Sequence, residues 1–282
     1  MKLCRYGKPG YEKPGMIDGE GKLRDLSKIV DHIGPNEISP RGLKMLTRLK
    51  AESLPLVNGS PRFGVPYVGI GKFVAIGLNY SDHAKEAGLP IPSEPIVFMK
   101  TTTCITGPGD GVIQPKNSTK LDWEVELGVV IGTQARYVDE ASALNHVAGY
   151  CIVNDVSERS WQMATTQWDK GKGFDTAGPI GPWLVTSDEI RDPQSLDMLL
   201  EVNGKKMQSG STRTMVFSVA KIISHVSHYM TLLPGDIIAT GTPPGVGMGI
   251  KPTPVFLKPG DVMRLTIAGL GEQKQRVVAY SA

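Results

Sequence analysis

The stretch Leu121-Asp-Trp-Glu-Val-Glu-Leu-Gly-Val-Val-Ile131 alternates between apolar and acidic residues and then becomes wholly apolar. This period of two predicts a β-strand, because successive side chains of a strand point to opposite faces. One face then carries apolar side chains, and the other carries Asp122, Glu124 and Glu126. Two glutamates on one strand face lie about 7 Å apart, close enough to share a cation. The stretch therefore predicts a strand with an acidic face near the interior.

A second apolar run, residues 147–156, contains a further carboxylate, Asp155, near its end. If this run is a strand, its end can bring a third oxygen ligand to Glu124 and Glu126. Three carboxylates without histidine or cysteine favour a hard cation such as Mg²⁺, Mn²⁺ or Ca²⁺ over zinc. The spacing alone leaves a second interpretation open, in which the acidic face is simply solvated.

A histidine and a glutamate, His83 and Glu86, are three positions apart in a short segment that ends at Gly88. A helical turn capped by Ser81 or Asp82 would place both on one face. The glutamate can orient the imidazole and raise its basicity, which would make His83 a general base for activating water. The alternative is a capped surface turn with an ordinary ion pair.

Two glycine-rich segments are further candidates for the site. Lys172 lies between Gly171 and Gly173, which could present its ammonium to a cavity. A compact cation suits a carboxylate or a developing enolate, although a solvated surface lysine is the alternative. The segment 240–247 offers backbone amides that could hold a carboxylate, and a plain turn explains it equally well.

Composition excludes several classes of function. The 282 residues include 31 Lys plus Arg and 28 Asp plus Glu, so a formal charge of +3 gives no polycation for nucleic acid or an anionic membrane surface. No apolar run approaches the ~20 residues of a membrane span, and the first residues lack the apolar stretch of a signal peptide. Three well-separated cysteines, Cys4, Cys104 and Cys151, indicate reduced thiols. We therefore expect a cytoplasmic protein without nucleic-acid or membrane partners.

The organisation of the chain predicts an α+β fold that is mostly β. The 33 glycines and 21 prolines indicate frequent turns and many short strands. An irregular Pro-rich segment precedes residue 70, where we place a boundary between a small N-terminal domain, 1–70, and a larger domain, 71–282. Helices are expected at about 40–52, with Ser39 as N-cap, and at about 218–230.

Five motifs occur together in one order. They are Gly77-Leu-Asn-Tyr-Ser-Asp-His83, Leu121-Asp-Trp-Glu-Val-Glu-Leu-Gly128, Asn154-Asp-Val-Ser-Glu-Arg159, Lys172-Gly-Phe-Asp175 and Thr240-Gly-Thr-Pro243. With these motifs the chain resembles the fumarylacetoacetate hydrolase family from about residue 70 to residue 282. The resemblance implies a mixed β-roll catalytic domain with a small N-terminal domain, and usually a homodimer.

The resemblance also implies roles for the residues at the matching positions. A divalent cation, Mg²⁺ or Mn²⁺, would be held by Glu124, Glu126 and Asp155. The catalytic residues would be the water-activating pair His83 and Glu86, together with Lys172 as a cation beside the metal. The residues that bind substrate would be Arg159, Gln162, Lys100 and Thr242.

The activity implied by the resemblance is metal-dependent hydrolysis of a C–C bond in a small anionic oxo acid. The chain looks most similar to the 2,4-diketo-3-deoxy sugar acid hydrolases, which release pyruvate and a second acid. Ureidoglycolate lyases, 2-oxo acid decarboxylases and hydroxyheptadienedioate isomerases of the same family stay as alternatives. A non-catalytic protein whose carboxylates hold a structural Ca²⁺ is the alternative of another class.

Overall fold

The computed structural model describes residues 1–281, and most of its strands belong to two sheets. The strands of the larger sheet are β1 Lys2–Tyr6, β2 Lys13–Ile17, β3 Leu23–Asp25, β4 Phe73–Gly77, β5 Ile96–Lys100, β6 Ile105–Thr106, β9 Val125–Ile131, β10 Val147–Asn154, β12 Gly178–Thr186 and β15 Ile237–Ala239. Nine of these ten strands follow the order β3-β2-β1-β12-β10-β9-β15-β4-β5, and β6 pairs with β12. The two strands that carry or adjoin the predicted carboxylates, β9 and β10, are therefore antiparallel neighbours in mid-sheet.

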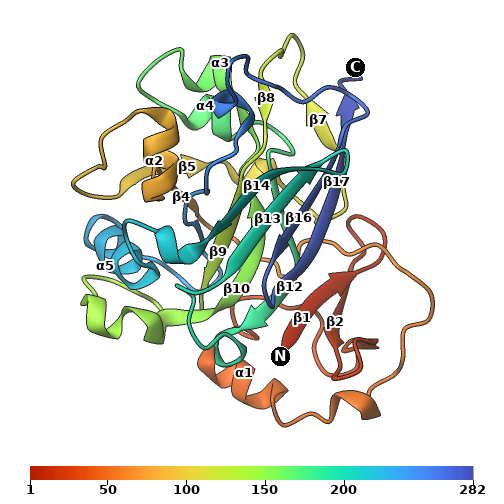
Figure 1. Ribbon diagram of the computed structural model, residues 1–282. Helices are drawn as coiled ribbons and strands as arrows, with labels where there is room; N and C mark the ends of the chain where they lie inside the picture. The colour runs from red at the N-terminus through yellow and green to blue at the C-terminus, as the bar shows by residue number, and fades with distance from the viewer. Residues whose placement is uncertain (282) are drawn as a thin grey trace.

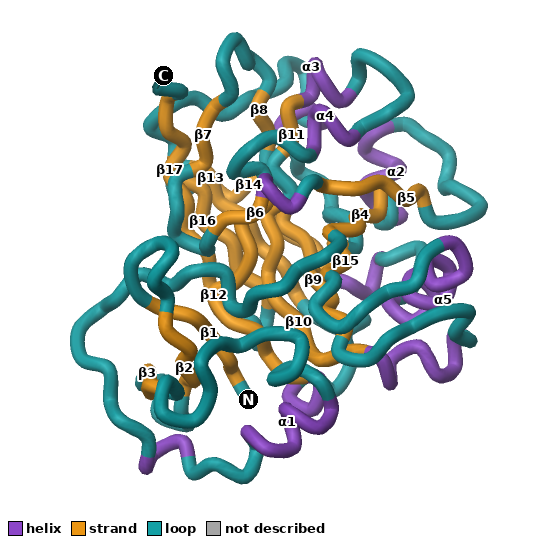
Figure 2. The backbone as a smooth tube through the Cα atoms, turned by 180° about the vertical axis from the view of Figure 1, so that it is seen from behind, coloured by secondary structure: helices purple, strands orange, loops and turns teal. Residues whose placement is uncertain are grey.

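The smaller sheet packs against the middle of the larger one. Its five strands are β7 Val112–Gln114, β13 Asp197–Val202, β14 Lys205–Ser211, β16 Val262–Ile267 and β17 Gly271–Ala279, in the order β14-β13-β16-β17-β7. Two further short strands, β8 Leu121–Asp122 and β11 Ser157–Glu158, form a ribbon of their own. The smaller sheet contacts β9, β10 and β12, so the main core lies between the two sheets. Figure 2 shows the helices around the periphery of the strands.

The described residues form five α-helices, which are α1 Pro40–Leu46, α2 Ser81–Ala87, α3 Arg159–Gln162, α4 Asp169–Lys172 and α5 Val219–Tyr229. The predicted Ser39 cap is confirmed, since the Gly42 amide donates to Ser39 Oγ at 3.1 Å. The helix is shorter than predicted, because after Thr47 its hydrogen bonds change from the i−4 to the i−3 carbonyl. The second predicted helix is confirmed as α5, and Ser218 caps it by accepting a hydrogen bond from the Lys221 amide.

The cap that the sequence predicted for α2 is wrong. The helix begins at Ser81 itself, with Tyr80 in extended conformation at the N-cap position and no side chain hydrogen-bonded there. Asp82 instead accepts a hydrogen bond from the amide of His83 at 3.0 Å. The predicted end is confirmed, because Gly88 has a left-handed φ of 68° that favours glycine.

The predicted acidic strand is interrupted near its start. Residues Trp123 and Glu124 separate β8 from β9. Their backbone amides donate to side chains and not to the backbone of a neighbouring strand. The Trp123 amide donates to Asp122 Oδ1 at 2.8 Å, and the Glu124 amide donates to Asn154 Oδ1 at 3.3 Å. The prediction of one continuous strand is therefore wrong, although the residues flanking the break are all buried.

The N-terminal residues extend the larger sheet. Strand β1 pairs antiparallel with β12, so that Leu3 lies opposite Leu184, and Figure 1 shows the red strands β1 and β2 beside β12. Leu3, Ile33 and Ile38 belong to the same apolar cluster as the residues of β9 and β10. The division at residue 70 stays a prediction, and the three N-terminal strands belong to the same sheet as later strands, with Leu3 of β1 and Met16 of β2 in the main core.

The three cysteines lie inside the fold as free thiols. Burial raises the pKa of Cys104 to about 11, and it raises the pKa values of Cys4 and Cys151 further. Within residues 1–281, each helix is too short or too polar to cross a membrane.

Candidate active site

Three carboxylates from two neighbouring strands converge on one point. Glu126 lies on β9, Glu124 immediately precedes β9, and Asp155 immediately follows β10. All three residues are buried, and one oxygen atom of each lies within 4.8 Å of the other two. The structure thus brings the predicted metal ligands together. Their oxygen-only donor set is the kind that Mg²⁺ and Mn²⁺ prefer, so the residues fit such a cation.

The charges of the two glutamates are compensated differently. Burial raises the pKa of Glu126 well above its usual range, and repulsion from Asp155 and Glu124 adds to the shift. Its side chain accepts a hydrogen bond of 2.8 Å from the amide of Gly241. Burial acts on Glu124 in the same direction, but Lys172 and Arg159 outweigh it and hold the pKa of Glu124 well below its usual range. Glu126 is therefore the carboxylate that a further cation would relieve most.

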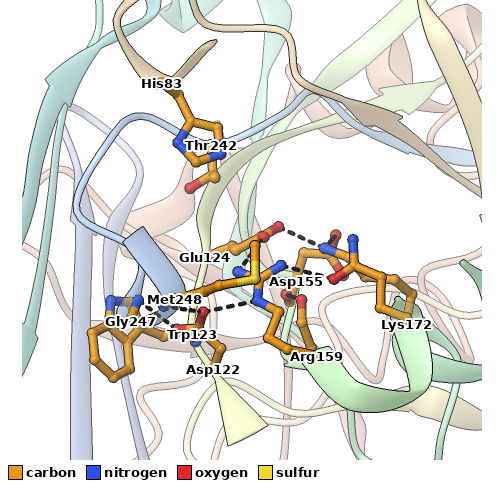
Figure 3. A network of polar contacts seen from close by, with 12 residues as sticks. His83, Asp122, Trp123, Glu124, Asp155, Arg159, Lys172, Thr242, Gly247 and Met248 are labelled. Atoms are coloured by element: carbon orange, nitrogen blue, oxygen red, sulfur yellow. Dashed lines mark hydrogen bonds and ion pairs between the residues drawn. The ribbon is translucent and has the colours of Figure 1, made fainter. Parts of the chain in front are cut away.

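Buried cations surround the other two carboxylates, as Figure 3 shows. Lys172 Nζ lies 2.7 Å from Glu124 Oε2 and 2.7 Å from Asp155 Oδ2. Arg159 Nη2 lies 2.7 Å from Glu124 Oε1, and Lys100 Nζ lies 2.6 Å from Asp155 Oδ1. The glycine-flanked Lys172 is thus directed into the acidic cluster, where it is 2% exposed, and is not a solvated surface lysine.

The four residues predicted to bind substrate occupy different places. Arg159 and Gln162 of α3 line the cavity beside the carboxylates, and Arg159 Nη1 donates to Gln162 Oε1 at 3.0 Å. Thr242 lines the same cavity, and its hydroxyl donates to a backbone carbonyl of β9 at 2.9 Å. Lys100 lies behind Asp155, where Nζ also donates to the backbone carbonyls of residues 172 and 177. Its contacts therefore fix Asp155.

Helix α2 presents the predicted base to the same cavity. His83 Nδ1 lies 2.9 Å from Glu86 Oε2, so the two residues form the predicted contact. Glu86 Oε1 in turn accepts a hydrogen bond of 2.9 Å from the amide of Gly245. Figure 3 places His83 apart from the ion-pair network, on the side of Thr242.

One cavity of about 440 Å³ is lined by all of the predicted site residues except Lys100. They are Glu124, Glu126, Asp155, His83, Glu86, Arg159, Gln162, Lys172 and Thr242. The polar groups of the cavity come from the three carboxylates, from α2, from α3 and from Lys172, Thr242 and Lys251. Much of the remaining wall is apolar, formed by Ile76, Leu78, Leu89, Ile96, Phe98, Met163, Trp168 and Met248. The cavity therefore combines a charged, buried part with a wall suited to an apolar group.

The glycine-rich segment that begins at Thr240 binds carboxylates of the protein itself. Its amides donate to Glu126 from Gly241 at 2.8 Å, to Glu86 from Gly245 at 2.9 Å, and to Asp122 from Gly247 at 2.7 Å and from Met248 at 3.0 Å. The interpretation of this segment as a carboxylate-binding element is confirmed for these side chains. The segment connects the candidate metal ligands with the candidate base.

Asp122 is the member of this network to which the sequence assigned no role. Its side chain is fully buried, and its Oδ2 lies 2.8 Å from Arg159 Nε. The signal was present in the sequence, because Asp122 is the first acidic residue of the alternation that also contains Glu124 and Glu126. The break after β8 then directs it to the amides of Gly247 and Met248, while it shares Arg159 with Glu124.

Comparison with known proteins identifies relatives over the whole chain. The family model described as "Fumarylacetoacetate (FAA) hydrolase C-terminal" matches residues 72–278. The chain is 62% identical over 276 residues to a Burkholderia multivorans protein that is provisionally named a hydrolase, and the match covers 98% of each chain.

Solved structures of similar proteins share the fold. A fumarylacetoacetate hydrolase from psychrophilic Exiguobacterium antarcticum is 36% identical with a TM-score of 0.89, covering 99% of this chain and 100% of that one. A maleylpyruvate hydrolase from Sphingobium sp. SYK-6, in complex with manganese(II) and pyruvate, is 29% identical with a TM-score of 0.84 and 100% coverage of both chains. A 2-hydroxyhepta-2,4-diene-1,7-dioate isomerase from Mycobacterium marinum is 33% identical with a TM-score of 0.75, again with 100% coverage of both chains. These likenesses confirm the predicted mostly β fold.

Proposed function

Because the chain belongs to the fumarylacetoacetate hydrolase family, we propose that it is a divalent-metal-dependent hydrolase of 2,4-diketo acids. The reaction would cleave the C3–C4 bond and release pyruvate and a second acid. One observation carries the proposal, namely that the three buried carboxylates and the His83–Glu86 pair line a single cavity. This arrangement supports an anionic oxo acid bound beside a base that can activate water.

The cation would be held by Glu124, Glu126 and Asp155, whose oxygen donors fit Mg²⁺ or Mn²⁺. When bound, it would supply Lewis-acid polarisation of the carboxylate and 2-oxo group of the substrate. The maleylpyruvate hydrolase that was solved with manganese(II) and pyruvate supports this pairing of metal and product.

His83 would act as the general base. Its Nδ1 lies 2.9 Å from Glu86 Oε2, and with the proton on Nδ1 the imidazole would present Nε2 to accept a proton from water. The water oxygen then attacks the C4 carbonyl carbon. As the C3–C4 bond breaks, its electron pair passes to the pyruvate enolate, and C3 then takes up the proton that His83 removed from water, which gives pyruvate and restores the neutral imidazole.

Lys172 would stabilise the charge that develops on the enolate. Burial lowers the pKa of Lys172, but Asp155 and Glu124 outweigh this effect and raise it above its ordinary value, so the ammonium stays protonated. A fixed cation in a buried site stabilises developing negative charge without reorganisation of solvent.

The variant Lys172→Met is expected to lower kcat and kcat/KM by similar factors, of about 100-fold, because the charge it offsets appears in the transition state. Steady-state kinetics at saturating Mg²⁺ measure both parameters. Lys170→Met is the matched control, since Lys170 is an exposed residue of the same short helix and should tolerate the change. A rise in KM alone would instead assign Lys172 to anchoring a ground-state carboxylate.

The acyl part of the substrate has two candidates. The first is the deoxy sugar acid implied by the sequence resemblance. The apolar wall, which includes Leu89, Phe98 and Trp168, favours a second candidate, an acylpyruvate with an aliphatic or unsaturated chain. Each hydroxyl that a sugar buries without a partner costs about 1–3 kcal/mol, whereas an apolar chain is stabilised by the same wall.

A panel of substrates with Mg²⁺ and with Mn²⁺ tests the proposal. It contains a 2,4-diketo-3-deoxy sugar acid, an aliphatic acylpyruvate, ureidoglycolate, oxaloacetate and a hydroxyheptadienedioate. Formation of pyruvate and a second acid supports hydrolysis. Glyoxylate with urea identifies a lyase, carbon dioxide a decarboxylase, and a shifted double bond without cleavage an isomerase. Tight Ca²⁺ binding without turnover of any member would contradict the enzymatic proposal and favour a structural ion.

We also propose that the protein acts as a homodimer, as the resemblance implies. Light scattering coupled to gel filtration tests this directly, because a dimer has twice the 30.4 kDa mass of one chain.

A further inference from the structure

We propose that Asp122 is a positioning residue that holds Arg159 in the orientation needed to bind the anionic head group of the substrate. This inference rests on the proposed function, because it assumes an oxo acid beside the carboxylate cluster. Asp122 itself does not line the cavity, whereas Arg159 does. The role proposed for Asp122 therefore acts through its partner.

All four hydrogen-bond partners of the Asp122 carboxylate are donors from the protein. Oδ1 accepts from the amides of Gly247 at 2.7 Å and Trp123 at 2.8 Å. Oδ2 accepts from the amide of Met248 at 3.0 Å and from Arg159 Nε at 2.8 Å, and Figure 3 shows these contacts together. With three backbone amides and one guanidinium around a fully buried carboxylate, its position is fixed.

The contact at Nε determines where the rest of Arg159 lies. A guanidinium is planar, so fixing Nε leaves the two terminal nitrogens along one edge. Nη1 donates to Gln162 Oε1 at 3.0 Å, and Nη2 lies 2.7 Å from Glu124 Oε1. Both of these neighbours line the cavity, so Asp122 directs the Nη edge of Arg159 along the cavity wall beside a candidate metal ligand.

Asp122 also connects the carboxylate cluster with the His83–Glu86 pair through the glycine-rich segment. The residue after it, Trp123, donates from Nε1 to the carbonyl of Gly245 at 3.1 Å, and the amide of Gly245 holds Glu86. The approach is close at Gly247, where an added Cβ would lie 2.7 Å from Asp122 Oδ1 and 2.0 Å from the carbonyl oxygen of Val255. A side chain at residue 247 would therefore displace the segment from Asp122.

Asparagine cannot replace Asp122 in this arrangement. Its Nδ2 would face two donors, the amide of Met248 and Nε of Arg159, and the buried guanidinium would lose one of its two counter-charges. The Arg159 side chain would then be free to leave the orientation set by Asp122.

The test uses the full chain loaded with Mn²⁺ and titrated with pyruvate by calorimetry, so that turnover is not the readout. Asp122→Asn is expected to weaken pyruvate binding about 10- to 100-fold, the usual effect of losing a residue that orients a ligand-binding group. Arg159→Met should weaken it at least as much. Because Asp122 acts through Arg159, the double variant should bind no more weakly than Arg159→Met alone. Losses that multiply in the double variant would overturn the proposal, since a general loss of stability predicts independent effects.

A second variant keeps the proposal testable if Asp122→Asn does not fold. Gly247→Ala leaves both charges in place but crowds Asp122, so it should weaken pyruvate binding in the same direction. Gly109→Ala is the matched control, because its Cβ would meet only one atom within 4 Å, at 3.9 Å. Wild-type pyruvate affinity in Gly247→Ala or Asp122→Asn would overturn the role of Asp122. Failure of the unmodified protein to bind Mn²⁺ and pyruvate would instead overturn the proposed function, and this inference with it.

Discussion

Glu126→Gln is expected to abolish turnover and to weaken Mg²⁺ or Mn²⁺ binding by at least about 100-fold, since even residues that only orient ligands contribute 10- to 100-fold. The metal-free variant should nevertheless stay folded. Glu126 is the buried carboxylate repelled by Asp155 and Glu124, and a neutral amide of the same shape removes that repulsion. Its amide oxygen can still accept from Gly241. Calorimetric titration of the metal and denaturant unfolding of the metal-free protein measure the two effects separately.

Glu124→Gln should lose metal binding equally but behave differently in stability. Glu124 is the common partner of Lys172 and Arg159, and its removal leaves both buried cations less compensated. Breaking a buried ion pair by removing one partner costs about 3–5 kcal/mol, and the lower end applies here because each cation keeps another carboxylate. The two glutamate variants should therefore share a binding defect and differ in their free energy of unfolding.

Asp236→Asn separates metal binding from general stability. Asp236 is also buried and pairs with Lys72 Nζ at 2.7 Å, but it precedes β15, at the opposite end of that strand from Gly241. It should lower stability and leave the metal affinity unchanged. Wild-type metal affinity in both glutamate variants would show that the carboxylate cluster is not the metal site.

His83→Ala is expected to lower kcat by about 10²–10⁴-fold, the usual contribution of a general base. Metal affinity should remain close to that of the unmodified protein, because His83 contacts Glu86 and none of the three carboxylate ligands. Glu86→Gln should give a smaller loss, since the imidazole remains but loses the carboxylate that orients it. Steady-state kinetics and metal titration on the same preparations compare the two quantities.

His228→Ala is the matched control for the histidine variant. His228 is exposed on α5, where Nδ1 lies 2.7 Å from the carbonyl oxygen of Ser224, and it does not line the cavity. Its turnover should equal that of the unmodified protein. Near-normal turnover in His83→Ala would mean that water is activated by another group.

The sequence predicted the fold best where the apolar pattern was long. The run that became β10 and the period-3.6 pattern of α5 were found close to their true bounds. The acidic strand was predicted as continuous because alternation reports the direction of side chains but not the pairing of backbone groups. At Trp123 and Glu124 the side chains of Asp122 and Asn154 take the amide hydrogen bonds, and no periodicity reveals such a substitution.

The candidate site was predicted in its residues but not in its connections. The carboxylate chemistry of Glu124, Glu126 and Asp155 predicts the metal site, and the antiparallel pairing of β9 with β10 brings the three residues together. The place of Lys172 inside the cluster depends on α4, which packs on α3 and β5 and thus on contacts between distant parts of the chain. The same holds for Lys100 behind Asp155. The glycine-rich segment did indicate amides for a carboxylate, but its spacing does not reveal that Asp122 is one of the carboxylates they hold.

The buried thiols allow this protein to be labelled without first removing its native cysteines. Maleimide reagents attack the thiolate, and at neutral pH burial leaves Cys4, Cys104 and Cys151 protonated and shielded from solvent. A cysteine introduced at the exposed Lys85 of α2 would therefore be the preferred attachment point for a fluorophore. Such a dye would sit two residues from His83, and its emission would follow the helix as metal and pyruvate are added.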